Sequence, residues 1–142
     1  MKKILAIILI LALLIGATLY FMYNEETDLA TTEKSVADFN AQDLLGEYNA
    51  DKAAADAKYL NKSIVVSGNI LNITPMEDKL IVEIEGKDAL ESITCNFDKS
   101  VVNQAEPFKI GEAIKFKGKC AGFTVDDLMG IKTITMVQCL PL

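Results

Sequence analysis

The most regular alternation of apolar and polar residues in the chain lies between Ala113 and Phe123. In this stretch, AIKFKGKCAGF, one side carries Ile114, Phe116, Gly118 and Cys120, and the other carries Lys115, Lys117 and Lys119. A period of two residues predicts a β-strand, and a glycine in its middle predicts a bend or bulge. We therefore expect a strand with one face toward a core and a row of lysines on its outer face.

Four further segments have strand character: residues 63–73, 79–86, 92–97 and 131–140. The alternation predicts an inward set of Leu80, Val82, Ile84, Ile93, Cys95 and Phe97, and an outward set of Ile81, Glu83, Glu85, Ser92, Thr94 and Asn96. The first segment is a long β-branched run interrupted by Gly68. A short helix is expected to begin at the N-cap Asp98 and to end before Pro107.

Helical signals precede the first strand. The pairs Ser35 with Asp38 and Asn40 with Asp43 resemble capping boxes. The first helix would bury Leu44, Leu45 and Tyr48, and Asn49 would cap a second helix over the alanine-rich stretch DKAAADAKYL. The spacing of this second helix places Ala53, Ala54, Ala57 and Leu60 on one face, which we expect to pack on the domain.

Five strands with a helix between the third and the fourth, and glycines in the middle of the first and the fourth, match a small coiled barrel. The pattern predicts a mainly β protein: a five-stranded OB-fold barrel with an N-terminal helical segment packed on it. A length of 142 residues allows one such domain. We assign residues 1–23 to a membrane anchor or signal sequence, 24–39 to a polar tether and 40–142 to the OB-fold domain.

The N-terminal segment is uncharged from Ile4 to Asn24 and follows Lys2 and Lys3. As a helix, residues 4–22 would rise roughly 28 Å, close to one hydrocarbon core. The length favours an uncleaved transmembrane helix over residues 4–23, in the inner membrane, with the C-terminal domain outside the cytoplasm. The alternative is a cleaved signal peptide and a secreted or periplasmic domain.

The amino-acid composition argues against several classes of protein function. The chain has no histidine and no tryptophan, and all 14 of its basic residues are lysines. Histidine, the usual general base and zinc ligand, is therefore missing. Arginine, which binds phosphate through two parallel hydrogen bonds, is missing as well. No catalytic motif is present, so we expect no enzyme activity, no cofactor and no metal. Without Lys2 and Lys3, 12 lysines face 20 acidic residues, which gives the remainder a net charge of −8.

Several stretches together resemble a known family: DLLGEYNADKAAADAKYLNKSIVVSGNILNI, ITCNFDKS, IGEAIKFKGKCAGF and a closing QC. In order and spacing, from about Leu44 to Leu140, they are similar to the OB-fold family described as tRNA anticodon-binding-like, small bacterial envelope proteins with a leader sequence. The resemblance implies an OB fold and a provisional link to nucleic acids. Members often have a lipidated cysteine after the leader. Here the first cysteine is Cys95, so a peptide anchor would replace the lipid.

Two sets of residues are candidates for ligand binding: Ser92, Thr94 and Asn96 on the third strand, and Lys115, Lys117 and Lys119 on the fourth. OB-fold domains bind ligands across the second and third strands. That face would carry Glu83 and Glu85 but no aromatic ring for base stacking. We therefore expect a binding module of the cell envelope whose ligand is a protein or an oligosaccharide. The alternative is single-stranded nucleic acid, bound along the lysines.

Two further groups of residues are candidates for special roles: the three cysteines, as a disulfide, and four acidic residues in loops. Cys120 and Cys139 fall on neighbouring strands of such a barrel, so they are the expected disulfide, with Cys95 buried as a free thiol. The alternative is three buried free thiols. The loops with Glu77 and Asp78 and with Asp126 and Asp127 are expected at the same end of the barrel, as solvated turns.

Overall fold

The computed structural model describes residues 10–20, 34–99 and 108–142. A helix covers residues 10–20. The folded domain contains the strands β1 (Asp38–Asn40), β2 (Ser63–Pro75), β3 (Lys79–Glu85), β4 (Glu91–Asp98), β5 (Ala113–Val125) and β6 (Lys132–Pro141), and the helices α2 (Ala41–Ala50) and α3 (Lys52–Tyr59). The five expected strands are thus confirmed as β2 to β6.

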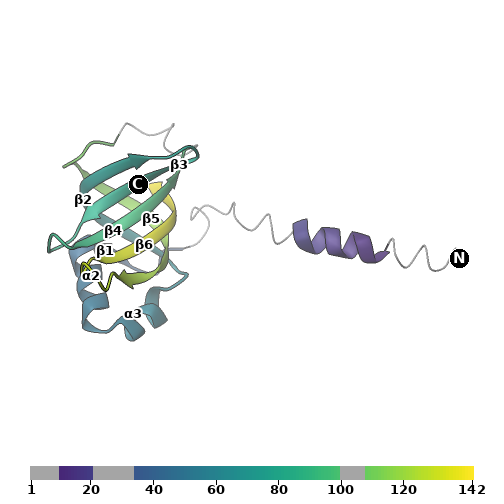
Figure 1. Cartoon of the computed structure of the whole chain (residues 1–142), viewed down its shortest axis with the longest axis horizontal. Helices are drawn as coiled ribbons and strands as arrows, with labels where there is room; N and C mark the ends of the chain where they lie inside the picture. The colour runs from purple at the N-terminus through teal and green to yellow at the C-terminus, as the bar shows by residue number, and fades with distance from the viewer. Residues whose placement is uncertain (1–9, 21–33, 100–107) are drawn as a thin grey trace, which may run out of the picture.

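The sheet closes on itself into a barrel. Its strand order is β1-β2-β3-β4-β6-β5, and β5 pairs back onto β2 (Figure 1). β4 and β6 are parallel, and the other neighbours within the barrel are antiparallel. This topology and the mainly β content confirm the predicted five-stranded barrel.

β2 takes part in both halves of the barrel, which explains why it is apolar on both sides. Its first half pairs with β5 and its second half with β3. Gly68 lies where the strand passes from one partner to the other, and a Cβ at this position would lie 2.5 Å from Cγ2 of Ile84. The strand can therefore bend tightly over the core only where it has no side chain.

The core contains the inward residues that the alternation predicts. Val82, Ile84, Ile93, Cys95, Phe97, Ile114, Phe116 and Cys120 are all buried, and Leu80 packs against them. Gly118 also faces inward, and the pairing of β5 with β6 shifts register between Lys117 and Lys119. The bulge expected at Gly118 is therefore present.

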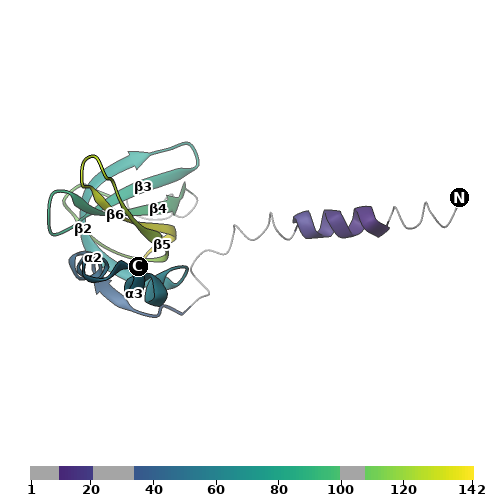
Figure 2. The same cartoon turned by 60° about the horizontal axis from the view of Figure 1, so that its bottom comes forward.

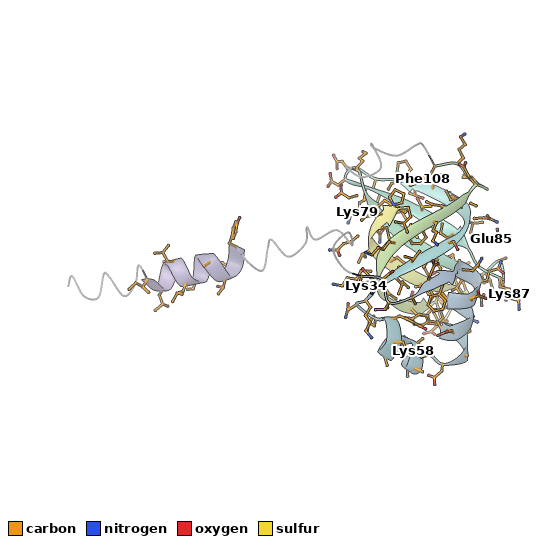
Figure 3. The ribbon with its side chains drawn as sticks, turned by 180° about the vertical axis from the view of Figure 1, so that it is seen from behind. Lys34, Lys58, Lys79, Glu85, Lys87 and Phe108 are labelled. Atoms are coloured by element: carbon orange, nitrogen blue, oxygen red, sulfur yellow. The ribbon has the colours of Figure 1, made fainter. Side chains whose placement is uncertain are left out.

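The two ends of the barrel are closed in different ways. α2 inserts Leu44, Leu45 and Tyr48 into the core at one end, where α3 packs beside it (Figure 2). At the other end, Phe108 packs on Phe97 with ring centroids 5.2 Å apart, far from Lys58 of α3 (Figure 3). The short helix expected after Asp98 falls mainly on residues outside the described part of the chain.

The first helix begins where expected, because the Asn40 side chain accepts a hydrogen bond from the Gln42 amide at 3.0 Å. The second helix differs from the prediction. Asp51, and not Asn49, caps α3 by accepting from the Ala54 amide at 3.0 Å. α3 buries Ala55 and Tyr59, whereas the predicted face of Ala53, Ala54, Ala57 and Leu60 is exposed. Tyr59 is held inward by Phe39, whose ring lies edge-on at 5.3 Å.

The segment before α2 also differs from the prediction. Ser35 and Asp38 do not cap a helix, because residues 38–40 form β1, which pairs in parallel with Val65, Val66 and Ser67 of β2. This strand lies at the end of the predicted tether and was not expected from the sequence. Within the described residues, no helix combines the length and the apolar character needed to cross a membrane.

Candidate functional site

The outer surface of β4 and β6 carries a compact group of uncharged polar side chains. The parallel register places Ser92 opposite Thr133 and Thr94 opposite Thr135. Asn96 follows on β4, and its Nδ2 donates a hydrogen bond to the backbone oxygen of Met136 at 3.3 Å. All five side chains are half-buried. We call these five residues the hydroxyl face.

The hydroxyl face continues onto both neighbouring strands. On β5, Thr124 lies opposite Thr133 and Gly122 lies opposite Thr135. On β3, Glu85 lies opposite Ser92 and Glu83 lies opposite Thr94. The polar surface therefore runs across four strands and ends at two carboxylates, in a geometry that offers many hydrogen bonds and no positive charge.

Sequence reasoning missed the β6 half of this face. Thr133 and Thr135 alternate with the buried Ile134 and Met136, so their outward direction can be read from the sequence. Their position beside Ser92 and Thr94 cannot be read in this way, because it depends on the parallel pairing of β4 with β6.

The three lysines lie on a different part of the barrel. They are opposite β2 on β5, at Ser67, Val65 and Ser63, and β6 separates them from β4. Lys115 donates to Oδ2 of Asp38 on β1 at 2.7 Å, so its charge is paired. Lys117 and Lys119 are half-buried. The six candidate residues thus form two surfaces and not one continuous site.

The cysteines are arranged differently from the expected disulfide. Cys95, Cys120 and Cys139 are free and buried. The bulges between β5 and β6 place Met136, and not Cys139, opposite Cys120. The sulfur of Cys120 lies 3.3 Å from the Tyr48 hydroxyl, whereas Cys139 is aligned with Phe97 on β4. The structure therefore contains the alternative arrangement, three buried thiols.

The four loop acids are also separated. Asp78 accepts a hydrogen bond from the Lys99 amide through its backbone oxygen, at one end of β4. The loop with Asp126 and Asp127 lies at the other end of β4, because the Lys132 amide donates to the backbone oxygen of Leu90 at 2.8 Å. Within residues 10–20, 34–99 and 108–142, no group of three or more potential metal ligands is found.

The side chain of Glu91, at the first residue of β4, is a buried carboxylate. Oε1 of Glu91 accepts a hydrogen bond from Nδ2 of Asn49 at 2.8 Å and lies 3.5 Å from Nζ of Lys132. These contacts join α2 to β4 and β6, so their first consequence is structural.

The family model described as tRNA_anti-like matches residues 1–133. The chain therefore belongs to the tRNA_anti-like family, as the sequence resemblance implied. None of the curated proteins compared with the chain matches it.

Solved structures with the same fold include a Klebsiella pneumoniae lipoprotein that is provisionally described as nucleic acid-binding. It is 18% identical, with a TM-score of 0.55, and the alignment covers 74% of this chain and 92% of that one. The Stn1–Ten1 complex of S. pombe is a weaker match, with 17% identity, a TM-score of 0.38 and coverage of 56% and 57%. At these identities the first likeness supports the OB fold, and the second supports no argument.

Proposed function

We propose that the protein is a non-enzymatic binding module of the bacterial cell envelope, anchored to the inner membrane through residues 4–23. The hydroxyl face is its binding surface, and the ligand is a protein or an oligosaccharide. The proposal rests on the parallel pairing of β4 with β6. This pairing places Ser92 beside Thr133 and Thr94 beside Thr135, so that their hydroxyl groups lie in two adjacent pairs. Such a face provides donors and acceptors in a fixed array.

Electrostatics supports an uncharged or basic ligand. Glu83 and Glu85 border the hydroxyl face on β3, and the chain carries a formal net charge of −6. A phosphate backbone approaching this face would be repelled, and no outward side chain of β3, β4 or β6 is aromatic, so bases have nothing on which to stack.

Single-stranded nucleic acid is the second candidate, because the family name and the description of the Klebsiella lipoprotein both point to it. Its contact surface would be the lysines of β5. A labelled oligonucleotide titrated into the full-length protein at low salt tests this candidate. Binding that falls steeply with salt and is lost in the variant Lys117→Gln/Lys119→Gln would support it, and no binding at low salt would exclude it.

A photo-crosslinker tests the proposed surface in cells. Benzoylphenylalanine at Thr135 of the full-length protein is expected to give a covalent adduct with an envelope protein or a glycan. The matched control has the crosslinker at Asn69, an exposed polar residue on β2. Equal labelling from both positions, or none from Thr135, would count against the hydroxyl face.

The anchor is tested by mass spectrometry of the mature N-terminus. Retention of residues 1–23 in a membrane fraction resistant to carbonate extraction is the expected result. A mature chain that starts near Thr18 would instead identify a cleaved leader.

A further inference from the structure

The loop between β5 and β6 displays two apolar side chains to solvent. Leu128 is 97% exposed and Met129 is 67% exposed. Isolated surface leucines are common, but two adjacent apolar side chains that contribute almost nothing to the core are less usual. We call Leu128 and Met129 the apolar tip.

Backbone and side-chain hydrogen bonds fix the loop that carries the apolar tip. Oδ1 of Asp126 accepts from the amides of Leu128 and Met129 at 2.8 and 2.9 Å. The Gly130 amide donates to the backbone oxygen of Asp126 at 2.8 Å, and Gly130 has the left-handed φ of 68° that closes the turn. The turn is therefore held by Asp126 and Gly130, and the two apolar side chains have no part in holding it.

The two amide hydrogen bonds favour the charged carboxylate of Asp126 and so lower its pKa below the ordinary value. A preformed turn loses little conformational freedom when it binds, which favours its use as an anchor.

The apolar tip lies beside the hydroxyl face and within an acidic surround. The β5–β6 loop, which carries the apolar tip, and the β3–β4 loop lie at the same end of the barrel (Figures 1 and 2). A hydrogen bond from the Lys132 amide, after the first loop, to the backbone oxygen of Leu90, in the second, connects them. Leu90 is itself 51% exposed. The exposed acids at this end include Glu85, Asp88, Asp126 and Asp127, and Lys87 is an exposed base; Figure 3 labels Glu85 and Lys87.

We propose that the apolar tip is the anchor through which the module docks a protein partner, and that this partner presents an apolar socket bordered by lysine or arginine. The inference rests on the proposed binding function and selects a protein as the ligand. A protruding side chain needs a concave apolar site to be buried, which a folded protein provides and an oligosaccharide does not. The surrounding carboxylates complement a basic border.

The same carboxylates argue against two other occupants. Insertion of Leu128 into a bilayer would bring Asp126 and Asp127 into the headgroup region, where anionic lipids repel them. A second copy of the chain would place one acidic surround against another. The crosslinking experiment below distinguishes a bilayer and a second copy of the chain from a different protein.

The test begins with the full-length protein in its own cells, with benzoylphenylalanine at position 128 or, as the matched control, at position 71. Leu71 is also an exposed apolar residue, at 46%, but it lies in β2. The expected result is an adduct with one other protein from position 128 only. An adduct with lipid, an adduct of twice the chain mass, or no adduct would each overturn the proposal.

The crosslinked protein is then purified and its affinity for full-length variants is measured. Leu128→Ser/Met129→Ser is expected to weaken binding about tenfold or more, whereas Leu71→Ser leaves it unchanged. Asp127→Lys is expected to weaken binding and to reduce its dependence on salt. Both loop variants should melt at the wild-type temperature, because none of Leu128, Met129 and Asp127 packs on the core. Wild-type affinity in the double variant would overturn the proposal.

A variant of the hydroxyl face separates this inference from the proposed function. Thr94→Arg places a long charged side chain in the middle of that face. If the apolar-tip variant loses the partner and Thr94→Arg keeps it, the anchor stands and the hydroxyl face fails. If only Thr94→Arg loses the partner, the hydroxyl face stands and the anchor fails.

Discussion

The hydroxyl of Tyr48, on α2, lies 3.3 Å from the sulfur of Cys120, on β5. The two groups meet inside the end of the barrel that α2 closes, and the Tyr48 ring stacks on Phe123 at 5.3 Å. This contact fixes α2 to the barrel by a polar interaction as well as by apolar packing. Its loss is therefore measurable in the stability of the whole domain.

Tyr48→Phe is expected to lower the free energy of unfolding by about 1 kcal/mol, the ordinary contribution of one buried hydrogen bond. Tyr48→Ala is expected to cost about 3–5 kcal/mol, because it also leaves a cavity in the core. Urea unfolding followed by circular dichroism measures both. Tyr59→Phe is the control. It removes a hydroxyl that donates to the half-buried Glu47 at 2.8 Å; because water reaches this carboxylate, the change should cost less than Tyr48→Phe.

Gly118→Ala tests the close approach of β5 to β6. A Cβ at this position would lie 2.7 Å from Sγ of Cys139 and 3.3 Å from Cε of Met136. We expect a loss of about 1–3 kcal/mol from overpacking, and a smaller loss when the same change is made in a Cys139→Ala background. A double-mutant cycle measures this coupling.

The control for this pair is Gly46→Ala in α2, where a Cβ meets no atom within 4 Å. A glycine in a helix interior is unfavourable relative to alanine, so this change should stabilise the protein by about 0.5–1 kcal/mol. If Gly118→Ala were as stable as the wild type, or if Cys139→Ala gave no relief, the packing of Gly118 against Cys139 would be wrong.

Stability should fall at alkaline pH because of the buried thiols. Burial raises the pKa of Cys95 and Cys120 above the ordinary value, although the Tyr48 hydrogen bond partly opposes this for Cys120. Below the unfolded pKa of about 8.5, both states are protonated and stability is complete. Above it the unfolded thiols lose protons that the folded thiols keep, so stability decreases by up to about 1.4 kcal/mol per pH unit for each thiol.

The measurement is the urea midpoint between pH 7.5 and 10.5 in a non-thiol reductant. Cys120→Ala should show a shallower decline than the wild type over the same range. Burial also raises the pKa of Tyr48 and, with the Glu47 hydrogen bond, that of Tyr59, so a further decline should begin near pH 10, the ordinary tyrosine value, and should be smaller in Tyr48→Phe. A midpoint independent of pH would contradict the burial of these groups.

The strands could be predicted because each has a period of two strong enough to identify its inward face. Val82, Ile84, Ile93 and Phe97 are buried as that period requires. β1 could not be predicted, since its three residues carry no periodic signal and are held by parallel pairing with β2. In α3 the alanines offer several equivalent faces, and the choice is made by Tyr59, which packs on Phe39.

The candidate site was partly predictable for the same reason. The outward direction of Ser92, Thr94 and Asn96 follows from the period of their own strand. The rest of the hydroxyl face depends on which strands are neighbours, as do the separation of the lysines from β4 and the partner of each cysteine. Register and bulges decide these relationships, and one-residue shifts reverse them.

The two carboxylates of β3 should select against anionic ligands. Glu83 and Glu85 stand opposite Thr94 and Ser92, so they face any ligand on the hydroxyl face. Glu83→Gln/Glu85→Gln should strengthen the binding of a single-stranded oligonucleotide at low salt, by up to about fivefold for each carboxylate, which corresponds to about 1 kcal/mol for an exposed charge. Fluorescence anisotropy of a labelled oligonucleotide with the full-length protein measures the change. Glu112→Gln removes an exposed carboxylate next to β5, beside the lysines of the second candidate surface, and should have no effect if the oligonucleotide lies on the hydroxyl face. If neutralising Glu83 and Glu85 left oligonucleotide affinity unchanged while Glu112→Gln raised it, the anion-repelling surface would lie outside the hydroxyl face.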